Sequence, residues 1–430
     1  MSAEGGFEAD WRWFCVEYII VAAAAVMLVF IVHVSFNADV ARRVLPVLLL
    51  AFITRLAVHV MLMRNGGTWY GGDNLTYESI SMEIVEEWKR EGVHFVALGQ
   101  AGSLKSVAVP CNLFAIVIYL CGGKAALACT AVVALLACGL CVLMYRFARL
   151  LDVDERSAFR LLIISAFTPA FLVHTSDTFK DGFNAFLVIA CLGLACSNMK
   201  RFDMRKLFVL GPLLWALWHV RPYMVFMCAP SLILSVLGSR RSPSLRVMAT
   251  LSMVLVPVLI LLGVAAEEGP FGAMREQLEY GQSDDLRRAV ASEDSGVVFE
   301  DGGSPWGALG PKLLYTLLSP FPWAEGTMML QFGKIEVVIW YYLLYSAVRG
   351  ARRLWRYDRS MFWILLLFIV PSMVAYATTM ANIGLIFRQR MPIVMVTSLL
   401  SAVAWTRVPP KKEQAPDSLS NERAGDYVKT

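Results

Sequence analysis

The sequence predicts an all-α integral membrane protein that crosses the bilayer many times. Of its 430 residues, 57% are hydrophobic and only 17% are charged, whereas soluble domains are about 45–50% apolar and about 25% charged. The apolar residues gather in long runs, and a bilayer span needs about 20 of them. This composition excludes an ordinary cytosolic enzyme, a disordered chain, a collagen-like fibre and a small disulfide scaffold.

The apolar runs give the elements in order: 17–36, 44–63, 107–121, 124–145, 158–175, 182–198, 207–220, 222–238, 246–266, 335–348, 361–380 and 391–406. The run 107–121 is short and contains Pro110 and Asn112, so we interpret it as an interfacial or re-entrant segment. The others predict about 11 spans, within a range of about 10 to 13. The first run follows acidic residues, which favours a retained span over a cleaved signal peptide.

Lysine and arginine residues between the runs predict the orientation, because cytoplasmic loops are enriched in them. Basic residues are concentrated in four segments, 200–206, 240–246, 349–359 and 407–412. All four agree with an N-terminus outside and a C-terminus inside, so the net charge of +5 reflects orientation. We expect one membrane domain (1–406) with large outer loops (64–123 and 267–334) and a disordered cytoplasmic tail (407–430).

The first outer loop contains the motif Gly71-Gly72-Asp73-Asn74-Leu75-Thr76-Tyr77. After it, the apolar residues Ile80, Ile84, Val85 and Trp88 fall on one helical face, which is typical of a helix lying in the membrane interface. Asp73 is a candidate general base there. The structural alternative is that Asp73 or Asn74 caps this helix.

An outer turn between two spans contains Thr175-Ser176-Asp177-Thr178-Phe179-Lys180-Asp181. Asp177 and Asp181 are four residues apart, so we expect them to share one helix face with Lys180 beside them. A lysine on the outer side opposes the usual charge bias and suggests an anionic ligand. The alternative is a solvated turn with an internal Lys–Asp pair.

The tight hairpin 207–238 has His219-Val220-Arg221-Pro222-Tyr223 at its outer tip. Two spans in so few residues place this tip below the membrane surface, where an arginine is costly unless it is paired. The guanidinium of Arg221 suits a phosphate or diphosphate, and Tyr223 lies beside it. The alternative is a buried structural pair with Asp177 or Asp181.

Two further pairs of basic residues interrupt the apolar pattern. Arg388 and Arg390 precede the last span on the outer side, again against the charge bias. Arg55 and His59 lie four apart on one face of the second span. These four are candidate substrate ligands. For Arg55 and His59 the alternative is snorkelling or contact between helices.

The predicted orientation places seven of these residues on one side of the membrane: Asp73, Asp177, Lys180, Asp181, Arg221, Arg388 and Arg390. Such a group suits transfer from a lipid phosphate, because cations would stabilise the leaving phosphate and a carboxylate would deprotonate the attacking hydroxyl. We therefore expect Asp73 to be catalytic, and Lys180, Asp177, Asp181, Arg221, Tyr223, Arg388, Arg390, Arg55 and His59 to bind substrate. No metal site is predicted, although a divalent cation could bridge Asp73 or Asp177 to the phosphate.

The order of these motifs, with Pro-Phe-Pro-Trp at 320–323 and Arg-Gln-Arg-Met-Pro at 388–392, resembles bacterial polytopic proteins of surface-polysaccharide assembly. They are similar to lipid-carrier-dependent glycosyltransferases of the GT-C superfamily and to O-antigen-polymerase-like proteins. The resemblance covers roughly residues 40 to 400. It implies that the acidic residue of the first outer loop, Asp73, is the catalytic base. This sequence has Asn74 where a second acidic residue is common.

The sequence thus predicts a glycosyltransferase or polysaccharide polymerase in a bacterial cytoplasmic membrane. It would use polyprenyl-(di)phosphate-linked sugar at the outer face, with membrane lipids and other glycan-assembly proteins as partners and no nucleic acid. Two other classes stay open. One is a transporter or flippase of an anionic lipid-linked substrate, which would need a site near mid-membrane. The other is a non-catalytic scaffold of a glycan-assembly complex.

Overall fold

The structure is a computed structural model that describes residues 4–64, 72–97, 107–237, 282–292, 296–323 and 328–407. In this part of the chain the regular elements are helices: α1 (Glu4–Ser35), α2 (Ala38–Arg64), α3 (Asp73–Glu91), α4 (Ala108–Cys121), α5 (Ala126–Leu150), α6 (Glu155–Phe167), α7 (Pro169–His174), α8 (Asp181–Lys200), α9 (Met204–Trp218), α10 (Pro222–Leu237), α13 (Asp284–Ala291), α14 (Leu309–Leu318), α15 (Met328–Tyr357), α16 (Arg359–Thr378), α17 (Ile383–Gln389) and α18 (Met391–Trp405). The predicted all-α class is confirmed.

Five helices are long and apolar enough to cross a membrane, and a sixth crossing arises if α17 and α18, bent by 58°, form one span. The five are Val16–Ser35 of α1, α2, α5, α8 and α16. The predicted number of 11 spans is therefore not reached within the described residues. The predicted span 246–266 and the tail 408–430 lie outside them.

Three predicted spans are too short or too interrupted to count as crossings. The run 158–175 is divided into α6 and α7 at Thr168-Pro169, because proline lacks a backbone donor and disfavours helical backbone in the residue before it. Helices α9 and α10 have 15 and 16 residues, or about 23 Å at 1.5 Å per residue. The hydrocarbon core is about 30 Å thick.

The helices pack into one bundle in which segments far apart in sequence lie side by side. Helix α5 packs against α1, α2 and α8, and α18 packs against α15. The last pair approaches closely at Gly350, where a Cβ atom would lie 1.7 Å from the carbonyl oxygen of Leu400. Small residues commonly allow such close packing between membrane helices.

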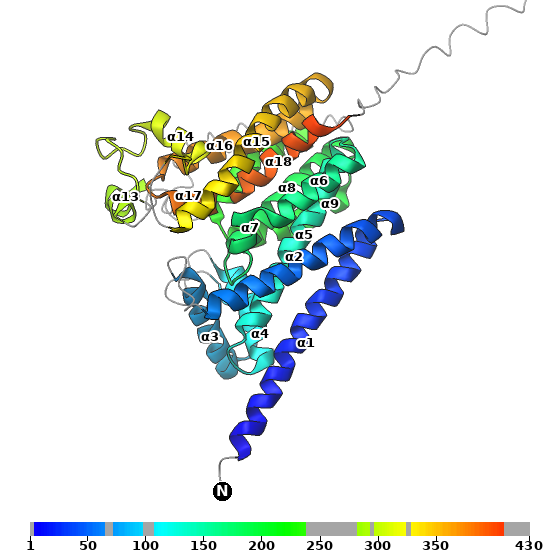
Figure 1. Cartoon of the computed structure of the whole chain (residues 1–430), viewed down its shortest axis with the longest axis vertical. Coiled ribbons are helices and arrows are strands. Elements are labelled where there is room, and N and C mark those ends of the chain that lie inside the picture. The colour runs from blue at the N-terminus through cyan, green and yellow to red at the C-terminus, as the bar shows by residue number, and fades with distance from the viewer. Residues whose placement is uncertain are drawn as a thin grey trace, which may run out of the picture.

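The helix predicted after Asp73 is confirmed as α3. Its apolar residues Ile80, Ile84, Val85 and Trp88 are all buried, and the helix packs against α4. Helix α4 has 14 residues and ends at Gly122, so it is too short to cross alone. In Figure 1, α3, α7, α13 and α17 lie toward the same side of the bundle. The candidate residues come from this side.

Candidate functional site

A cluster of five charged residues forms where α3, α8 and α17 begin or end near one another. We name it the Asp181 cluster; its members are Asp73, Lys180, Asp181, Arg221 and Arg388. Arg388 joins the first residues of two helices: its Nη2 donates to Asp73 Oδ2 (2.6 Å) and its Nε donates to Asp181 Oδ2 (3.2 Å). The hydrogen bond to Asp73 spans 315 positions of sequence.

The second guanidinium of the cluster comes from the predicted hairpin tip. Arg221 lies between α9 and α10; its Nη2 donates to Asp181 Oδ1 (2.6 Å) and its Nη1 donates to the Tyr223 hydroxyl (2.8 Å). Asp181 therefore receives one guanidinium on each oxygen. The alternative interpretation of Arg221, a buried ion pair with Asp181, is what the structure shows.

The cluster is buried at one end and open at the other. The side chain of Asp181 is 1% exposed and that of Arg388 is 10% exposed, whereas that of Asp73 is 45% exposed. Asp181 thus acts as an internal anchor that fixes both arginines. Asp73 is the member that a ligand reaches most easily.

Lys180 adds a third cation next to this open end. Its Nζ lies 5.8 Å from the ring centre of Tyr77, and the guanidinium of Arg388 lies 5.0 Å from that of Phe179. Burial and repulsion by Arg221 lower the pKa of Lys180 to about 8, against the attraction of Asp181 and Asp73. Among the described residues the cluster therefore combines three cations with two carboxylates, and its arginine and lysine side chains are groups that bind phosphate.

The cap interpretation of Asp73 and Asn74 is wrong. Gly72, in the left-handed conformation, precedes the helix, and Asp73 is its first residue with its carboxylate on Arg388. Asn74 uses its side-chain Nδ2 to donate to Asp177 Oδ2 (2.8 Å). A carboxylate in the first helical turn still interacts favourably with the helix dipole.

Asp177 and Asp181 do not share a helix face, because α8 begins only at Asp181. Asp177 lies in the preceding loop and receives Asn74 on one oxygen; His59 Nδ1 lies 3.7 Å from the other. The loop is tied to α3 a second time by Thr178, whose hydroxyl donates to the carbonyl oxygen of Asn74 (3.3 Å). Asp177 therefore holds the start of α3 against α2.

Arg55 and His59 make contacts between helices, which agrees with the structural alternative. The three donor nitrogens of Arg55 bond to the hydroxyl of Thr175 (2.7 Å) and to the carbonyl oxygens of Ala51 and Ala166. His59 Nδ1 lies 3.1 Å from the hydroxyl of Thr130. Both side chains are buried.

Arg390 lies outside the Asp181 cluster, although it is only two residues from Arg388. Its Nη1 donates to the carbonyl oxygens of Thr316 (3.2 Å) and Leu317 (3.4 Å) at the end of α14. The guanidinium also packs against the rings of Trp340 and Phe387. A cation at a helix C-terminus is stabilised by the helix dipole, so these contacts give Arg390 a structural role.

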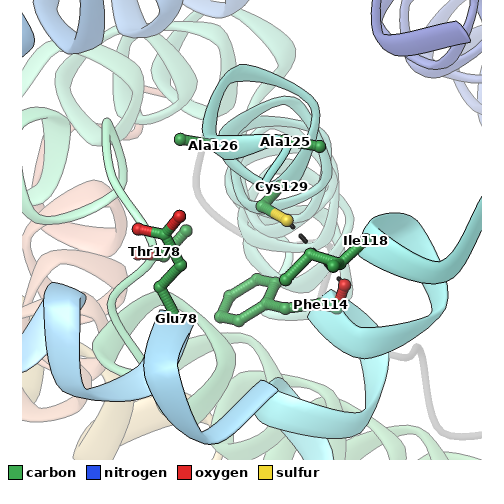
Figure 2. Close-up of a pocket in the computed structure, with 7 residues that line it drawn as sticks. All are labelled: Glu78, Phe114, Ile118, Ala125, Ala126, Cys129 and Thr178. Atoms are coloured by element: carbon green, nitrogen blue, oxygen red, sulfur yellow. Dashed lines mark hydrogen bonds between the residues drawn. The ribbon is translucent and has the colours of Figure 1, made fainter. Parts of the chain in front are cut away.

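A narrow pocket between α3, α4 and the start of α5 contains a carboxylate that the sequence reasoning missed, Glu78. Figure 2 shows the Glu78 side chain beside Thr178, facing Phe114 and Cys129. The remaining lining residues are Ile118, Ala125 and Ala126. Glu78 follows Asp73 by five residues in the predicted amphipathic helix. This position was the sequence signal that could have identified Glu78 as a second candidate carboxylate.

Among the described residues, those around Asp73 do not include three metal-ligating side chains within reach of one another. Within the described residues, the group of three or more metal-ligating side chains within reach of one another lies elsewhere, at Glu87, Glu91 and His94. Arg388 stands between Asp73 and Asp181 and supplies the positive charge that a cation would supply. The cation bridge to Asp73 or Asp177 stays a prediction.

The fold and the cluster define a class: a polytopic all-α membrane protein with a partly open group of cations and carboxylates. No protein-family model and no curated protein sequence matches the chain. Among solved structures, it is similar to the oligosaccharyltransferase AglB of Archaeoglobus fulgidus in complex with an inhibitory peptide and a dolichol-phosphate, with a TM-score of 0.52 and 14% identity over 84% of this chain.

The apo form of the Archaeoglobus fulgidus oligosaccharyltransferase is also similar, with a TM-score of 0.49 and 15% identity over 84% of this chain. The chain spans half the length of either protein, since it covers 50% of each. At 14% identity, the likeness to AglB shows a similar fold.

Proposed function

We propose that this chain transfers or polymerises sugars carried on a polyprenyl phosphate or polyprenyl diphosphate, at the extracytoplasmic face of a bacterial membrane. The observation that carries the proposal is the Arg388 guanidinium, which links the half-exposed carboxylate of Asp73 to the buried carboxylate of Asp181. A base and a phosphate ligand are thereby held next to each other at an accessible position. The fold shared with AglB, which was solved with a dolichol-phosphate, agrees with a lipid-linked substrate.

The chemistry assigns one role to each member of the cluster. The hydroxyl oxygen of the acceptor attacks the anomeric carbon of the donor sugar, and the bond from that carbon to the phosphate oxygen breaks. Asp73 takes the hydroxyl proton as general base. The electron pair leaves with the lipid (di)phosphate, whose charge Arg388 and Lys180 stabilise.

Arg221 and Asp181 are positioning residues in this proposal. Both are buried, and Arg221 uses its donors on Asp181 and Tyr223. Asp181 fixes Arg388 through its second oxygen. Arg221 balances the charge of Asp181, so that the charge of Arg388 stays available to Asp73 and to the substrate.

The test is a transfer assay with purified full-length chain in lipid vesicles and radiolabelled lipid-linked sugar. Covalent product formed by the wild type and lost in Asp73→Asn supports the proposal. The matched control is Asp152→Asn, which removes a half-exposed carboxylate at the Lys200 ion pair; Asn tolerates the left-handed conformation of this position. A change of sidedness without covalent product would show a transporter instead.

A further inference from the structure

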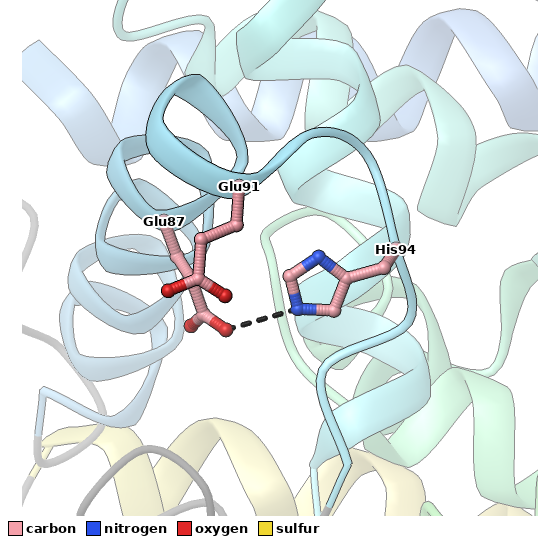
Figure 3. A group of neighbouring side chains, drawn as sticks. All are labelled: Glu87, Glu91 and His94. Carbon is pink, nitrogen blue, oxygen red and sulfur yellow. Dashed lines mark hydrogen bonds and ion pairs between the residues drawn. The ribbon is translucent and has the colours of Figure 1, made fainter.

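A second group of ligand-forming side chains lies at the far end of α3. Glu87 and Glu91 are four residues apart on the helix, and His94 follows just after it. One ligand atom from each residue lies within 4.8 Å of the others. Figure 3 shows the two carboxylates and the imidazole turned toward one another.

The imidazole of His94 has a fixed orientation. Its Nδ1 lies 2.9 Å from the carbonyl oxygen of Gly92, so this nitrogen carries a proton and donates. The other nitrogen, Nε2, lies 3.0 Å from Glu87 Oε1. Because a carboxylate oxygen has no proton to donate, a positive species must stand between these atoms, either a proton on Nε2 or a metal ion. A backbone carbonyl on the second nitrogen is the usual partner of a metal-ligating histidine.

The carboxylates of Glu87 and Glu91 both lie beside the imidazole of His94 and favour a positive charge at Nε2. A metal ion at this point would be favoured by the same negative groups, and it would displace the proton.

The segment that carries His94 is held in place by neighbouring side chains. The indole nitrogen of Trp88 donates to the carbonyl oxygen of His94 (2.7 Å). The Asn112 side chain accepts from the backbone nitrogen of Val96 and donates to its carbonyl oxygen, both at 3.0 Å. The chain turns at Gly92, whose φ of +85° favours glycine. The imidazole is therefore presented by an ordered turn.

The two basic residues near Glu87 on α3, Lys89 and Arg90, contact Glu86 instead of Glu87 or Glu91. Lys89 pairs with Glu86 Oε1 (2.7 Å), and Arg90 Nε donates to the carbonyl oxygen of Glu86 (3.3 Å). Glu87 and Glu91 are like charges at i and i+4, an arrangement that destabilises a helix. A divalent cation between them would remove this repulsion.

We propose that Glu87, Glu91 and His94 bind one divalent transition-metal ion, with zinc as the best fit. Two carboxylate oxygens and one imidazole nitrogen suit zinc, and water would complete its coordination. The ion fastens the turn after α3 to the last turn of the helix. From Asp73 to Glu87 the helix rises about 21 Å at 1.5 Å per residue, so this site is separate from the Asp181 cluster and does not rest on the proposed function.

The test is a calorimetric titration of the full-length chain, stripped with EDTA and kept in detergent, with zinc chloride. We expect one zinc ion per wild-type chain, and an affinity about tenfold or more lower in His94→Ala, Glu87→Gln and Glu91→Gln. His33→Ala is the matched control, because His33 is an exposed histidine near the end of α1 that bonds to Val29. Its zinc affinity should equal that of the wild type.

A second measurement does not depend on the alanine variant folding. Zinc should raise the Tm of the wild type but not that of Glu91→Gln, and cobalt bound in its place should give visible d–d absorption. Two results would overturn the proposal: no zinc binding by the wild type, or the same zinc affinity in Glu91→Gln and His94→Ala as in His33→Ala.

Discussion

Two ion clusters on the described part of the chain are built from the same groups but differ in how they end. The second, which we name the Asp301 cluster, consists of Asp284, Arg287, Asp301 and Lys312. Asp301 Oδ2 receives Lys312 (2.5 Å) and Arg287 (3.3 Å), as Asp181 receives Arg388 and Arg221. The Lys312 side chain is fully buried, with 0% exposed.

The difference lies in the outer carboxylate of each cluster. In the Asp301 cluster this is Asp284, which pairs with Arg287 (3.2 Å) and also with the exposed Arg288 (2.6 Å). In the Asp181 cluster it is Asp73, which is 45% exposed and pairs with the bridging Arg388. An outer carboxylate held by two cations fastens segments together, whereas an exposed carboxylate beside a bridging arginine leaves both groups within reach of a ligand. Four predictions follow this contrast, from the largest expected effect to the smallest.

Removing the carboxylate at the open end should abolish chemistry and spare the fold. Asp73→Asn should lower the transfer rate by about 10²–10⁴-fold, the usual contribution of a general base. Its Tm should change little, since a half-exposed ion pair contributes about 0–1 kcal/mol. Rate and Tm are measured on the same preparation, beside Asp301→Asn. Full transfer by Asp73→Asn would remove Asp73 from the mechanism.

Removing either central carboxylate should destabilise the protein. Asp181→Asn and Asp301→Asn each leave two cations without their shared partner, and breaking a buried pair costs about 3–5 kcal/mol. Thermal unfolding in detergent should show both losses. Per folded molecule, only Asp181→Asn should also lose transfer activity, because only Asp181 fixes Arg388. Equal activity losses in both variants would erase the distinction between the clusters.

The geometry of the bridging guanidinium should matter more than its charge. In Arg388→Lys one ammonium group cannot reach Asp73 and Asp181 as the planar fork does. We expect transfer to fall about tenfold, the effect of losing one charge-assisted hydrogen bond of about 1.5 kcal/mol. Arg287→Lys, the equivalent change in the Asp301 cluster, should leave transfer unchanged. A normal rate in Arg388→Lys would show that charge alone suffices.

The smallest effect is a pH dependence from Lys180, whose pKa is lowered to about 8. The protonated fraction of this lysine falls as the pH rises through 8, so binding of a lipid phosphate should weaken a few-fold between about pH 7 and pH 9. Facing groups are Asp73, Asp181, Arg221 and Arg388. In Lys180→Arg the guanidinium stays charged and the dependence should flatten. An unchanged profile in Lys180→Arg would assign the titration to another group.

The sequence was a good guide to which residues lie together in the structure. It was a poorer guide to the contacts that each of them makes. The charge bias of the loops indicates one side for Asp73, Asp181, Arg221 and Arg388, and the structure brings these four together. The bias carries no information on which side of a helix a residue faces. Arg388 lies in α17, whereas Arg390 lies at the junction of α17 and α18, which are bent by 58°, and its guanidinium reaches the end of α14.

The errors in the fold come from helix boundaries. The apolar run 158–175 predicts one span, yet Thr168-Pro169 divides it into two helices. The Thr-Pro pair was the sequence signal for this helix boundary. Asp177 and Asp181 were expected on one face, but α8 begins at Asp181 because Asp177 is held in the loop by Asn74. That contact joins residues 103 positions apart, and no local pattern encodes it.

The most direct test of the central claim measures binding without chemistry. Polyprenyl phosphate lacking a sugar is titrated into the wild type, Arg388→Gln and Asp73→Asn, and the Kd is measured. We predict that Arg388→Gln raises the Kd about tenfold, or about 1.4 kcal/mol. Asp73→Asn should leave the Kd unchanged or lower it, because the carboxylate that competes for Arg388 is neutralised. Equal weakening in both variants, or none in Arg388→Gln, would contradict an open, anion-binding end of the Asp181 cluster.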